Sequence, residues 1–584
     1  MDIRYQINRI DIIKGFILFL IVVGFSIPYL LLMIEIQKAT LNDFTIWPLA
    51  IFRILLYSLF SPLVFIITLS MVRIHKLLAN LYSIIYISSY FIALIIILIY
   101  FKYFGTIPQI TLLKSMNMGG MEAFSILVKL VYNQLLGFQE WFIILLLFCT
   151  ISLTYMFLRL AKTREIKGYI KFSMLVLVLL IYYGLYEIQT YRYRNYFGSN
   201  SSWLGRSSEA VSYFGLTPVY KKLLTYRIFH KTVPLPYPGK INKKNKRNDN
   251  IPRFKGANVI IIQAESLDSL AVDFQINGKP IMPFLHSLKN RSVYFKNFFS
   301  QHSGGASTDA DLSMLTSLLP LPNQVGLYTA KHDLIKSLVE ELEQRGYKSM
   351  VMSSVSFVFH DKTSSYPKIG FDHFYDSNFY SGKATGWYSK DLDFFDQSAP
   401  IIKNSAKPFF AYLVMHQSHG PFKNYSDSTR KNFNFENTDF SKLEIDYLMS
   451  MNEVDRALQH FFYKILESEI LNNTILIIYG DHSGHALRDP GCLAECVPLF
   501  IYHTSLPPKV ETKVGSHLDL APTVLDLLDI PEPFGWLGTS LFAEGRKVVL
   551  LNDLTSVEVI DGVLKKHVAM EYQPYLEYSN SLVE

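Results

Sequence analysis

The stretch Thr474–His485, TILIIYGDHSGH, decides the fold. Its apolar run Ile475–Tyr479 has the length and β-branched character of a strand buried on both faces, which is typical of a parallel sheet. The run is followed by Asp481, His482 and His485. In open α/β sheets polar groups gather past the carboxyl ends of strands, and an Asp oxygen beside a His nitrogen suits Zn²⁺ or Mn²⁺ better than Mg²⁺. Alone, the stretch also fits a strand with an Asp-containing turn.

Two stretches further upstream place polar groups in a related way. NVIIIQA, Asn258–Ala264, is a second buried-type strand, and it is followed by Glu265. SGGASTDADLSML, Ser303–Leu315, is a glycine-rich turn, then Ser307 and Thr308, then a helical pattern. A hydroxyl at a helix N-terminus lies among free N–H groups, which favours phosphate binding, and a divalent metal makes such a hydroxyl a competent nucleophile. A simple N-cap is the alternative interpretation of that hydroxyl.

The chain from residue 257 to residue 584 alternates strands with helices. This order predicts an α/β domain with a mostly parallel central sheet and helices on both faces. His416 and His419 follow one of the strands. Besides the strands quoted above, we expect a helical stretch Met314–Leu319, helices Asp333–Arg345 and Leu443–Glu467, and strands Lys348–Ser353 and Pro408–Met415.

The first 190 residues have a different composition. The whole chain has 584 residues, of which 50% are hydrophobic and 18% are charged, so it averages two unlike halves. Apolar segments of about 20 residues are long enough to cross a bilayer as helices. Residues 1–190 therefore predict a five-span transmembrane domain, with spans at Gly15–Ile36, Leu49–Val72, Leu78–Tyr100, Trp141–Leu160 and Tyr169–Glu187.

The distribution of basic residues predicts the orientation in the membrane. They cluster before the first span, between the second and third, and between the fourth and fifth, so the N-terminus is expected in the cytoplasm. An odd number of spans then places the chain after residue 191 outside. Gly105–Gln139 is expected to be an outer loop with an interfacial helix at Ala123–Leu136, or else a re-entrant segment. The net charge of +7 arises at these flanks and in one linker, so nucleic acid is not required as a partner.

Residues 191–256 are expected to link the two domains. Their part Thr232–Arg253 is rich in proline and then strongly basic, which is typical of a solvated tether. Of the three cysteines, Cys149 lies in an apolar run. Cys492 and Cys496 lie in the polar half, where a local disulfide and two free thiols are both open.

Several motifs in a fixed order resemble one known family. They are NVIIIQAES, GGASTDADLSMLTSL, IGFDHFYD, GWYSKDLDFF, SHGPF, YGDHSGH and HLDLAPTVLDLLDI. Together with five spans, they resemble the sulfatase-like branch of the alkaline phosphatase superfamily, in particular the lipoteichoic acid synthase type of phosphoglycerol transferase. The resemblance covers roughly residues 10–542.

The resemblance implies a metal site and a nucleophile. Glu265, Asp481 and His482 would hold one divalent metal ion, with Mn²⁺ favoured and Zn²⁺ possible, and the nucleophile hydroxyl would be its fourth ligand. Matching the acidic residues after the hydroxyls puts Ser307 at the nucleophile position. A shift of one residue would make it Thr308 instead.

The resemblance also implies substrate contacts. His419 would bind phosphate or protonate the leaving alkoxide, and His517 would support the site from behind. The remaining candidates for substrate contact are His360, Trp387, Asp391, His416 and His485. The synthases carry a Trp and an Arg after the position of His360, and this chain has neither type there, so the identity of the donor stays open.

The function implied is transfer of phosphoglycerol from phosphatidylglycerol to a cell-envelope glycan or polymer, at the bacterial cytoplasmic membrane. A lipid phosphoethanolamine transferase is the first alternative, although that class usually has several disulfides in its soluble domain. A sulfatase is excluded because no cysteine lies in a Cys-x-Pro-x-Arg segment. A non-catalytic protein of the same fold is the last alternative, and it would not need the complete set of metal ligands and hydroxyls.

Overall fold

The computed structural model divides the chain into two compact units. One contains the N-terminal helices and the other contains residues 231–584. The residues that the structure describes are 9–40, 60–72, 76–104, 138–160, 234–301, 307–320, 327, 330–357, 362–380, 388–420, 422–435, 439–487, 495–545, 547–551 and 555–583.

The described part of the N-terminal unit is helical. Its elements are α1 (Arg9–Thr40), α3 (Phe60–Val72), α4 (Lys76–Phe104) and α7 (Phe138–Leu160). Three of these helices are long and apolar enough to cross a membrane, with windows at Phe16–Met33, Leu77–Leu98 and Phe142–Arg159.

These windows confirm long apolar helices at three of the five predicted spans. Helix α3 has 13 residues and takes up the described part of the predicted second span, whose residues 49–59 lie outside the described residues. The predicted fifth span, residues 169–187, lies outside the described residues, as does the expected interfacial helix at residues 123–136.

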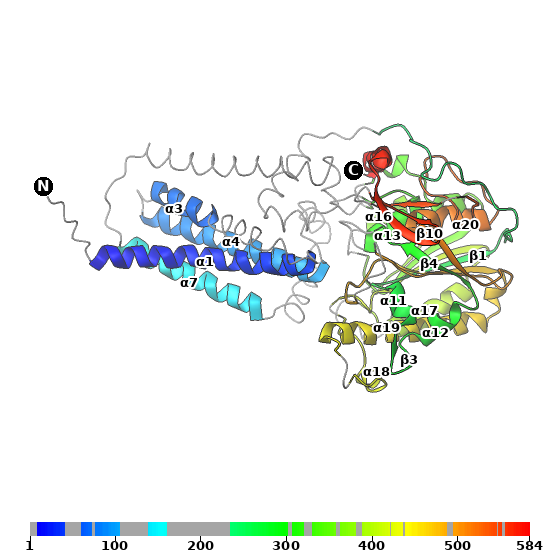
Figure 1. Cartoon of the computed structure of the whole chain (residues 1–584), viewed down its shortest axis with the longest axis horizontal. Helices are drawn as coiled ribbons and strands as arrows, with labels where there is room; N and C mark the ends of the chain where they lie inside the picture. The colour runs from blue at the N-terminus through cyan, green and yellow to red at the C-terminus, as the bar shows by residue number, and fades with distance from the viewer. Residues whose placement is uncertain are drawn as a thin grey trace. The chain divides into compact units, whose positions relative to one another are not determined.

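The second unit is built on an eight-stranded sheet with the order β10-β4-β9-β8-β1-β7-β5-β6. Its strands β10, β4 and β1 are labelled in Figure 1. Every neighbouring pair in the sheet is parallel except the two pairs that β9 makes with β4 and β8. The sheet is therefore mostly parallel, as predicted. Its strands are β1 (Asn258–Ala264), β4 (Val293–Phe299), β5 (Lys348–Ser353), β6 (His373–Tyr375), β7 (Phe409–Val414), β8 (Thr474–Gly480), β9 (Leu499–Tyr502) and β10 (Lys509–Ser516).

Helices cover both faces of this sheet. Alternate residues of a strand point to opposite faces, and in the central strands the residues on both faces are apolar. Val259 and Ile261 of β1 belong to one core, and Ile260 and Ile262 belong to the other. The first core is shared with α13 (Ser307–Thr316), α15 (Leu338–Glu343), α16 (Lys362–Lys368), α20 (Leu520–Leu527) and α21 (Gln573–Val583). The second is shared with α11 (Ser269–Asp273), α12 (Pro283–Leu288), α17 (Asp391–Lys403) and α19 (Lys442–Leu466), and α18 (Asp427–Lys431) lies beside α19.

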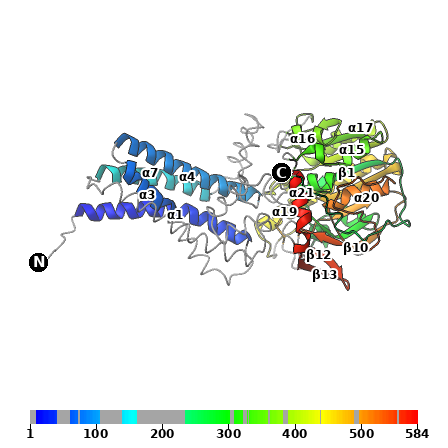
Figure 2. The same ribbon diagram turned by 90° about the horizontal axis from the view of Figure 1, so that it is seen from above.

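The remaining strands form two small antiparallel sheets. The larger one consists of β11 (Val548–Leu550), β12 (Thr555–Ile560) and β13 (Val563–Val568), and it packs against β10 (Figure 2). The smaller one pairs β2 (Gln275–Ile276) with β3 (Lys279–Pro280).

The described end of the predicted linker is not a free tether. Residues 234–256 belong to the second unit, where the Ile241 N–H donates to the carbonyl of Leu537 and Tyr237 donates its hydroxyl proton to the carbonyl of Trp536, at 3.0 and 2.6 Å. Arg253 pairs with the buried Asp526 at 3.0 Å. At least one basic residue of this segment therefore makes a fixed ion pair within the domain.

Candidate functional site

The register of two neighbouring strands brings two acidic residues together. Strands β1 and β8 run parallel, and Ala264 lies opposite Gly480 at their carboxyl ends. The next residues along the two strands are Glu265 and Asp481, which therefore emerge side by side at one edge of the sheet. Both are buried, with exposed fractions of 0% and 1%.

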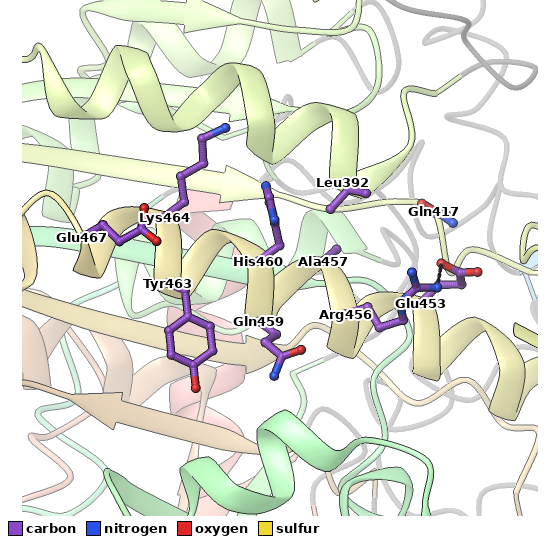
Figure 3. A pocket seen from close by; sticks show the side chains of 10 residues that line it. All are labelled: Leu392, Gln417, Glu453, Arg456, Ala457, Gln459, His460, Tyr463, Lys464 and Glu467. Atoms are coloured by element: carbon purple, nitrogen blue, oxygen red, sulfur yellow. Dashed lines mark ion pairs between the residues drawn. The ribbon is translucent and has the colours of Figure 1, made fainter. Parts of the chain in front are cut away.

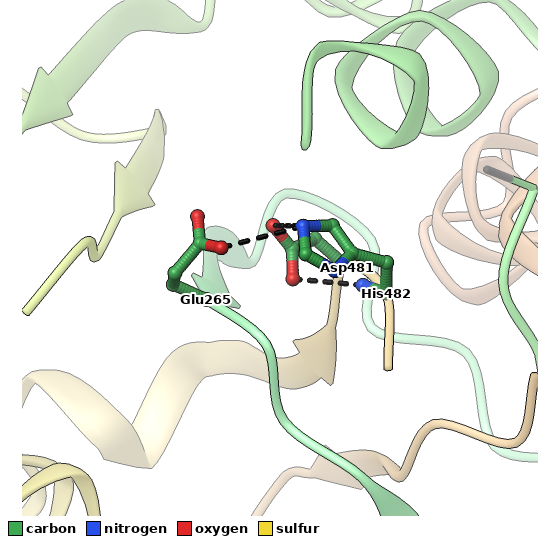
Figure 4. Close-up of side chains that lie close together, drawn as sticks. All are labelled: Glu265, Asp481 and His482. Atoms are coloured by element: carbon green, nitrogen blue, oxygen red, sulfur yellow. Dashed lines mark hydrogen bonds and ion pairs between the residues drawn. The ribbon is translucent and has the colours of Figure 1, made fainter. Parts of the chain in front are cut away.

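Glu265, Asp481 and His482 form a compact group (Figure 4). Their ligand atoms lie within 4.8 Å of one another. Nε2 of His482 is 3.3 Å from Oε1 of Glu265 and 3.6 Å from Oδ2 of Asp481. Nδ1 of the same ring lies 2.9 Å from the carbonyl of Ser483, so it carries the proton and Nε2 faces the two carboxylates. These are the three residues that the family resemblance implies as metal ligands.

Ser307 adds a hydroxyl to this group. It is the first residue of α13, and its Oγ lies 3.0 Å from Oε2 of Glu265 and 3.3 Å from Nε2 of His482. Thr308 is buried, with an exposed fraction of 2%. Because neighbouring residues of a helix point about 100° apart, the two hydroxyls do not face the same partners.

The three residues shift one another's pKa values strongly. Burial, and then the negative charge of Glu265, raise the pKa of Asp481 to about 7. Burial alone would lower the pKa of His482, but Asp481 and Glu265 together raise it well above its usual value. Burial opposes ionisation of Glu265, yet His419 and His482 hold its pKa well below the usual range.

A divalent metal ion fits these residues. Oδ1 of Asp481 accepts hydrogen bonds from the backbone N–H groups of Ser266 and His482, at 2.8 and 2.7 Å. Its Oδ2 is buried, and within the part of the chain that the structure describes it has no hydrogen-bond partner. A buried carboxylate oxygen without a donor, next to a second carboxylate and an imidazole nitrogen, is the donor set that Mn²⁺ and Zn²⁺ accept.

Ser266 is a residue that the sequence interpretation missed. Its side chain donates to Oε1 of Glu265 at 2.8 Å, while its own backbone holds Asp481. Its φ of 55° lies in the left-handed region, where a non-glycine residue is strained. The signal that could have found it is its position directly after a predicted ligand at a strand end.

The loop after β7 carries the predicted His416 and His419. His419 directs Nδ1 to the carbonyl of Gly420 at 3.0 Å, which leaves Nε2 as the nitrogen without the proton. Burial lowers the pKa of His419, and it lowers the pKa of His416 to about 3, so both rings are neutral at pH 7. The Ser418 hydroxyl donates to the carbonyl of Glu265 at 2.7 Å and ties this loop to the metal ligands.

Asp391 lies under the same loop. It begins α17, and one of its oxygens faces the backbone N–H groups of His416 and Gln417, each at 3.4 Å. Its own N–H donates to the Gln417 side chain at 2.9 Å. Burial raises the pKa of Asp391 to about 7. These contacts identify Asp391 as a support of the loop that carries His419.

The other predicted residues have different surroundings. His485 pairs with Glu495 at 3.1 Å, and its side chain is 60% exposed. His517 is fully buried: it accepts from the N–H of Gln301 at 3.1 Å and donates to the carbonyl of Gly480 at 3.0 Å, directly before Asp481. His360 and Trp387 lie outside the described residues. Cys496 is in a disulfide bond, whereas Cys492 is not described.

A groove of about 690 Å³ lies on the outer side of α19, beside α17 (Figure 3). Its charged groups largely pair with neighbours: Lys464 and His460 both contact Asp396, at 2.5 and 2.7 Å, and Arg456 lies 3.6 Å from Glu453. We therefore place the reaction centre at the ligand group and not in this groove. The groove is lined by Leu392, Gln417, Glu453, Arg456, Ala457, Gln459, His460, Tyr463, Lys464 and Glu467.

Comparison with known proteins agrees with the motifs. Residues 257–530 match the family model described as Sulfatase. The chain is 28% identical over 313 residues to lipoteichoic acid synthase 2 of Bacillus subtilis, covering 49% of this chain and 48% of that protein. It is 27% identical over 354 residues to lipoteichoic acid synthase of Staphylococcus aureus, covering 56% and 52%. The chain thus spans about half the length of the relatives it matches.

Two solved structures share the fold. The lipoteichoic acid synthase LtaP of Listeria monocytogenes has a TM-score of 0.51 at 23% identity, covering 58% of this chain and 96% of that one. The lipooligosaccharide phosphoethanolamine transferase EptA of Neisseria meningitidis has a TM-score of 0.53 at 13% identity, covering 88% and 95%. At these identities the likeness concerns the fold alone.

Proposed function

We propose that this chain is a membrane-anchored, metal-dependent phosphoglycerol transferase. The proposal is supported by the sulfatase domain of the alkaline phosphatase superfamily at residues 257–530 and by the lipoteichoic acid synthases among its homologues. The chain would move phosphoglycerol from phosphatidylglycerol to an envelope glycan or polymer, through a covalent intermediate on Ser307. One observation carries this proposal: Oγ of Ser307 opens a helix at 3.0 Å from Glu265 and 3.3 Å from His482.

Glu265, Asp481, His482 and Ser307 would hold the metal ion, which we expect to be Mn²⁺, with Zn²⁺ as the alternative. When bound, the ion supplies positive charge that lowers the pKa of a hydroxyl and stabilises charge on phosphoryl oxygens. The chain's own contribution is the placement of four buried or half-buried donors around one point.

In the first half of the reaction, Oγ of Ser307 attacks phosphorus and its proton passes to water, while Glu265, whose pKa is held well below the usual range, stays ionised as a ligand and keeps Oγ in place at 3.0 Å. The bond from phosphorus to the diacylglycerol oxygen breaks, the released alkoxide takes up a proton from water to give diacylglycerol, and phosphoglycerol stays on the serine. The N–H groups at the start of α13 face the phosphoryl oxygens with the positive end of the helix dipole. The helix start thus supports the same charge that the metal site supports.

In the second half, an acceptor hydroxyl attacks phosphorus and the bond to Oγ of Ser307 breaks. His419 suits the proton transfer of this step, because it is neutral and its Nε2 carries a lone pair when Nδ1 donates to Gly420. The same nitrogen, once protonated, can return the proton to a leaving oxygen. This role is consistent with its place on the loop that Ser418 ties to Glu265.

The apolar helices of the N-terminal unit support a lipid donor. A tethered catalytic domain meets lipid headgroups at a high effective concentration, without diffusing to them from bulk solution. We infer that the chain lies in the bacterial cytoplasmic membrane with the sulfatase domain outside, since the basic loops favour a cytoplasmic N-terminus.

The test uses the purified full chain in detergent with Mn²⁺ and, separately, Zn²⁺. Fluorescently tailed phosphatidylglycerol and phosphatidylethanolamine are supplied in parallel, and labelled diacylglycerol and the intact mass of the protein are measured. Diacylglycerol from phosphatidylglycerol alone, with a phosphoglycerol adduct on the protein, is the expected result.

Release from phosphatidylethanolamine instead would identify a phosphoethanolamine transferase, which keeps the site chemistry and changes the donor. The likeness to the EptA fold, over 88% of the chain, is the reason to include this arm. No release from either lipid, by protein that demonstrably binds metal, would overturn the lipid-transferase proposal.

A further inference from the structure

A buried ion pair lies behind the nucleophile helix. Lys362, the first residue of α16, places Nζ 2.7 Å from Oδ2 of Asp311 in α13. The side chains are only 3% and 0% exposed. None of the expected metal or substrate contacts involves this pair.

Two tyrosines complete the surroundings of the Asp311 carboxylate. The Tyr366 hydroxyl donates to Oδ2 at 3.0 Å, and the Tyr412 hydroxyl lies 2.6 Å from Oδ1. Burial, and then the charge of Asp311, raise the pKa of both tyrosines well above the usual value. Both phenols therefore stay protonated as donors, and the carboxylate is held from both of its oxygens.

This network reaches Ser307 from two directions. Asp311 lies four residues after Ser307 on the same helix, so the two side chains share a face. From the sheet, Gln263 of β1 directs its Nε2 to the carbonyl of Ser307 at 3.4 Å. Its Oε1 accepts from the hydroxyl of Tyr479 at 2.5 Å and lies 2.7 Å from the hydroxyl of Tyr412. The first turn of α13 is thus connected to β1, β7, β8 and α16.

Stability alone is a weak reason for such a pair. The cost of removing two charges from water often exceeds the attraction between them, and well-packed apolar residues of similar volume stabilise a core as well or better. What a charged, hydrogen-bonded pair adds is direction, because its partners must meet at fixed distances and angles. Here that direction is imposed one helical turn from the candidate nucleophile.

We propose that Lys362 and Asp311 are positioning residues, which fix the first turn of α13 so that Oγ of Ser307 meets the metal ligands. The inference rests on the proposed role of Ser307 as nucleophile and metal ligand. A displacement of about 1 Å at a reacting group can reduce a rate by about 100-fold, so a small shift of this turn is enough to matter.

The test compares the single variants Lys362→Met and Asp311→Asn with the double variant that carries both. Each single variant leaves one buried charge without its partner and is expected to unfold at a lower temperature. The double variant removes both charges, so its melting temperature is expected to return close to that of the wild type. Formation of the adduct in a single turnover is nevertheless expected to stay about 30- to 100-fold slower.

A second readout does not depend on the lipid substrate. Mn²⁺ affinity, measured by electron paramagnetic resonance, is expected to weaken about tenfold in the double variant, as it does for supports behind metal ligands. Tyr366→Phe removes one hydrogen bond to Asp311 and keeps the ring, and we expect a smaller loss in the same direction, without a change in fold.

The matched control is a second buried Lys–Asp pair among the described residues, Lys547 and Asp519 at 3.3 Å, in the double variant Lys547→Met with Asp519→Asn. It is expected to change stability and to leave Mn²⁺ affinity and adduct formation as in the wild type.

Recovery of stability, Mn²⁺ affinity and adduct formation together in the Lys362→Met, Asp311→Asn variant would overturn the positioning role. Equal losses in the control would also overturn it, since the effect would then belong to any buried pair. If wild-type protein forms no adduct, the proposed function fails, and the Mn²⁺ comparison still decides the positioning role.

Discussion

Replacing the two neighbouring hydroxyls separately tests the identity of the nucleophile. Ser307→Ala removes the Oγ that lies 3.0 Å from Glu265, whereas Thr308→Val removes a hydroxyl from a side chain that is only 2% exposed. We expect Ser307→Ala to lower single-turnover diacylglycerol release by at least about 10⁴-fold, because loss of a nucleophile costs on the order of 10⁶-fold in a serine hydrolase.

The change in stability is expected to be small in both variants. Ser307→Ala removes one hydrogen bond to a charged group, a loss of about 2 kcal/mol in the metal-free protein. Thr308→Val keeps the volume and loses a hydroxyl, which we expect to cost about 1 kcal/mol and to leave turnover within a few-fold of the wild type. Ser307→Thr keeps a hydroxyl at the same position and is expected to retain part of the activity.

The assay follows diacylglycerol release and intact mass at saturating Mn²⁺, with circular dichroism to show that each variant is folded. A phosphoglycerol adduct that persists in Ser307→Ala and disappears in Thr308→Val would refute the assignment. It would mean that the first turn of α13 is rotated by one residue relative to the structure described here. Equal loss in both variants, with folding intact, would argue that neither side chain alone is the attacking group.

Three further outcomes follow from burial and charge. Asp481→Asn should increase the free energy of unfolding of the metal-free protein at pH 8 by about 2 kcal/mol and so raise its melting temperature, because it relieves the repulsion from Glu265 that helps to raise the pKa of Asp481 to about 7. The same variant should lose the rise in melting temperature that Mn²⁺ causes in the wild type. A lower melting temperature of the metal-free variant would contradict this reasoning. Burial raises the pKa of Asp455 to about 7, so the folded state binds more protons than the unfolded state between about pH 4 and 7. The free energy of unfolding should therefore fall as pH rises through this window, by at most about 4 kcal/mol. Chemical denaturation at several pH values should show a weaker dependence of that free energy on pH for Asp455→Asn. Gly480→Ala would place a Cβ 2.4 Å from the carbonyl oxygen of Leu267, so the end of β8 would have to shift. We expect a lower melting temperature and weaker Mn²⁺ binding, both measured by calorimetry. If neither changes, the end of the strand can move without affecting the site.

The part of the site that could be predicted from the sequence is the part that follows directly from strand ends. NVIIIQA and TILIIYG are uninterrupted apolar runs, and each stops at a ligand. Two buried parallel strands with ligands at their carboxyl ends need only be neighbours for those ligands to meet, and β1 and β8 are neighbours. The mostly parallel sheet is confirmed for the same reason, since uninterrupted apolar runs are typical of strands that are buried on both faces.

Elements with polar sequences were harder to predict. Helix α13 begins with the polar sequence STDADL, yet Asp309 and Asp311 in it are fully buried. The expected helix at Met314–Leu319 starts too late, because it rests on the apolar residues alone. The sequence of β10 shows no regular alternation of apolar and polar residues, because the first half of the strand is largely exposed and only its last three residues are buried. The segment 234–256 looked like a tether because its partners, such as Leu537, lie far away in the sequence.

The same limit explains why the Lys362–Asp311 pair was not predicted. A lysine after His360, in a stretch where the family match is loose, carries no periodic or motif signal, and its burial depends on the packing of α16 against α13. Yet the topology gives such a contact a purpose. The hydrogen-bonded register of β1 and β8 places the three ligands Glu265, Asp481 and His482. Ser307 belongs to a helix in a different layer, and no ladder of strand hydrogen bonds fixes the position of that helix along the strands. A site assembled from both layers needs a directional contact between them, and Asp311, with Lys362, Tyr366 and Tyr412, supplies one within a single turn of the serine.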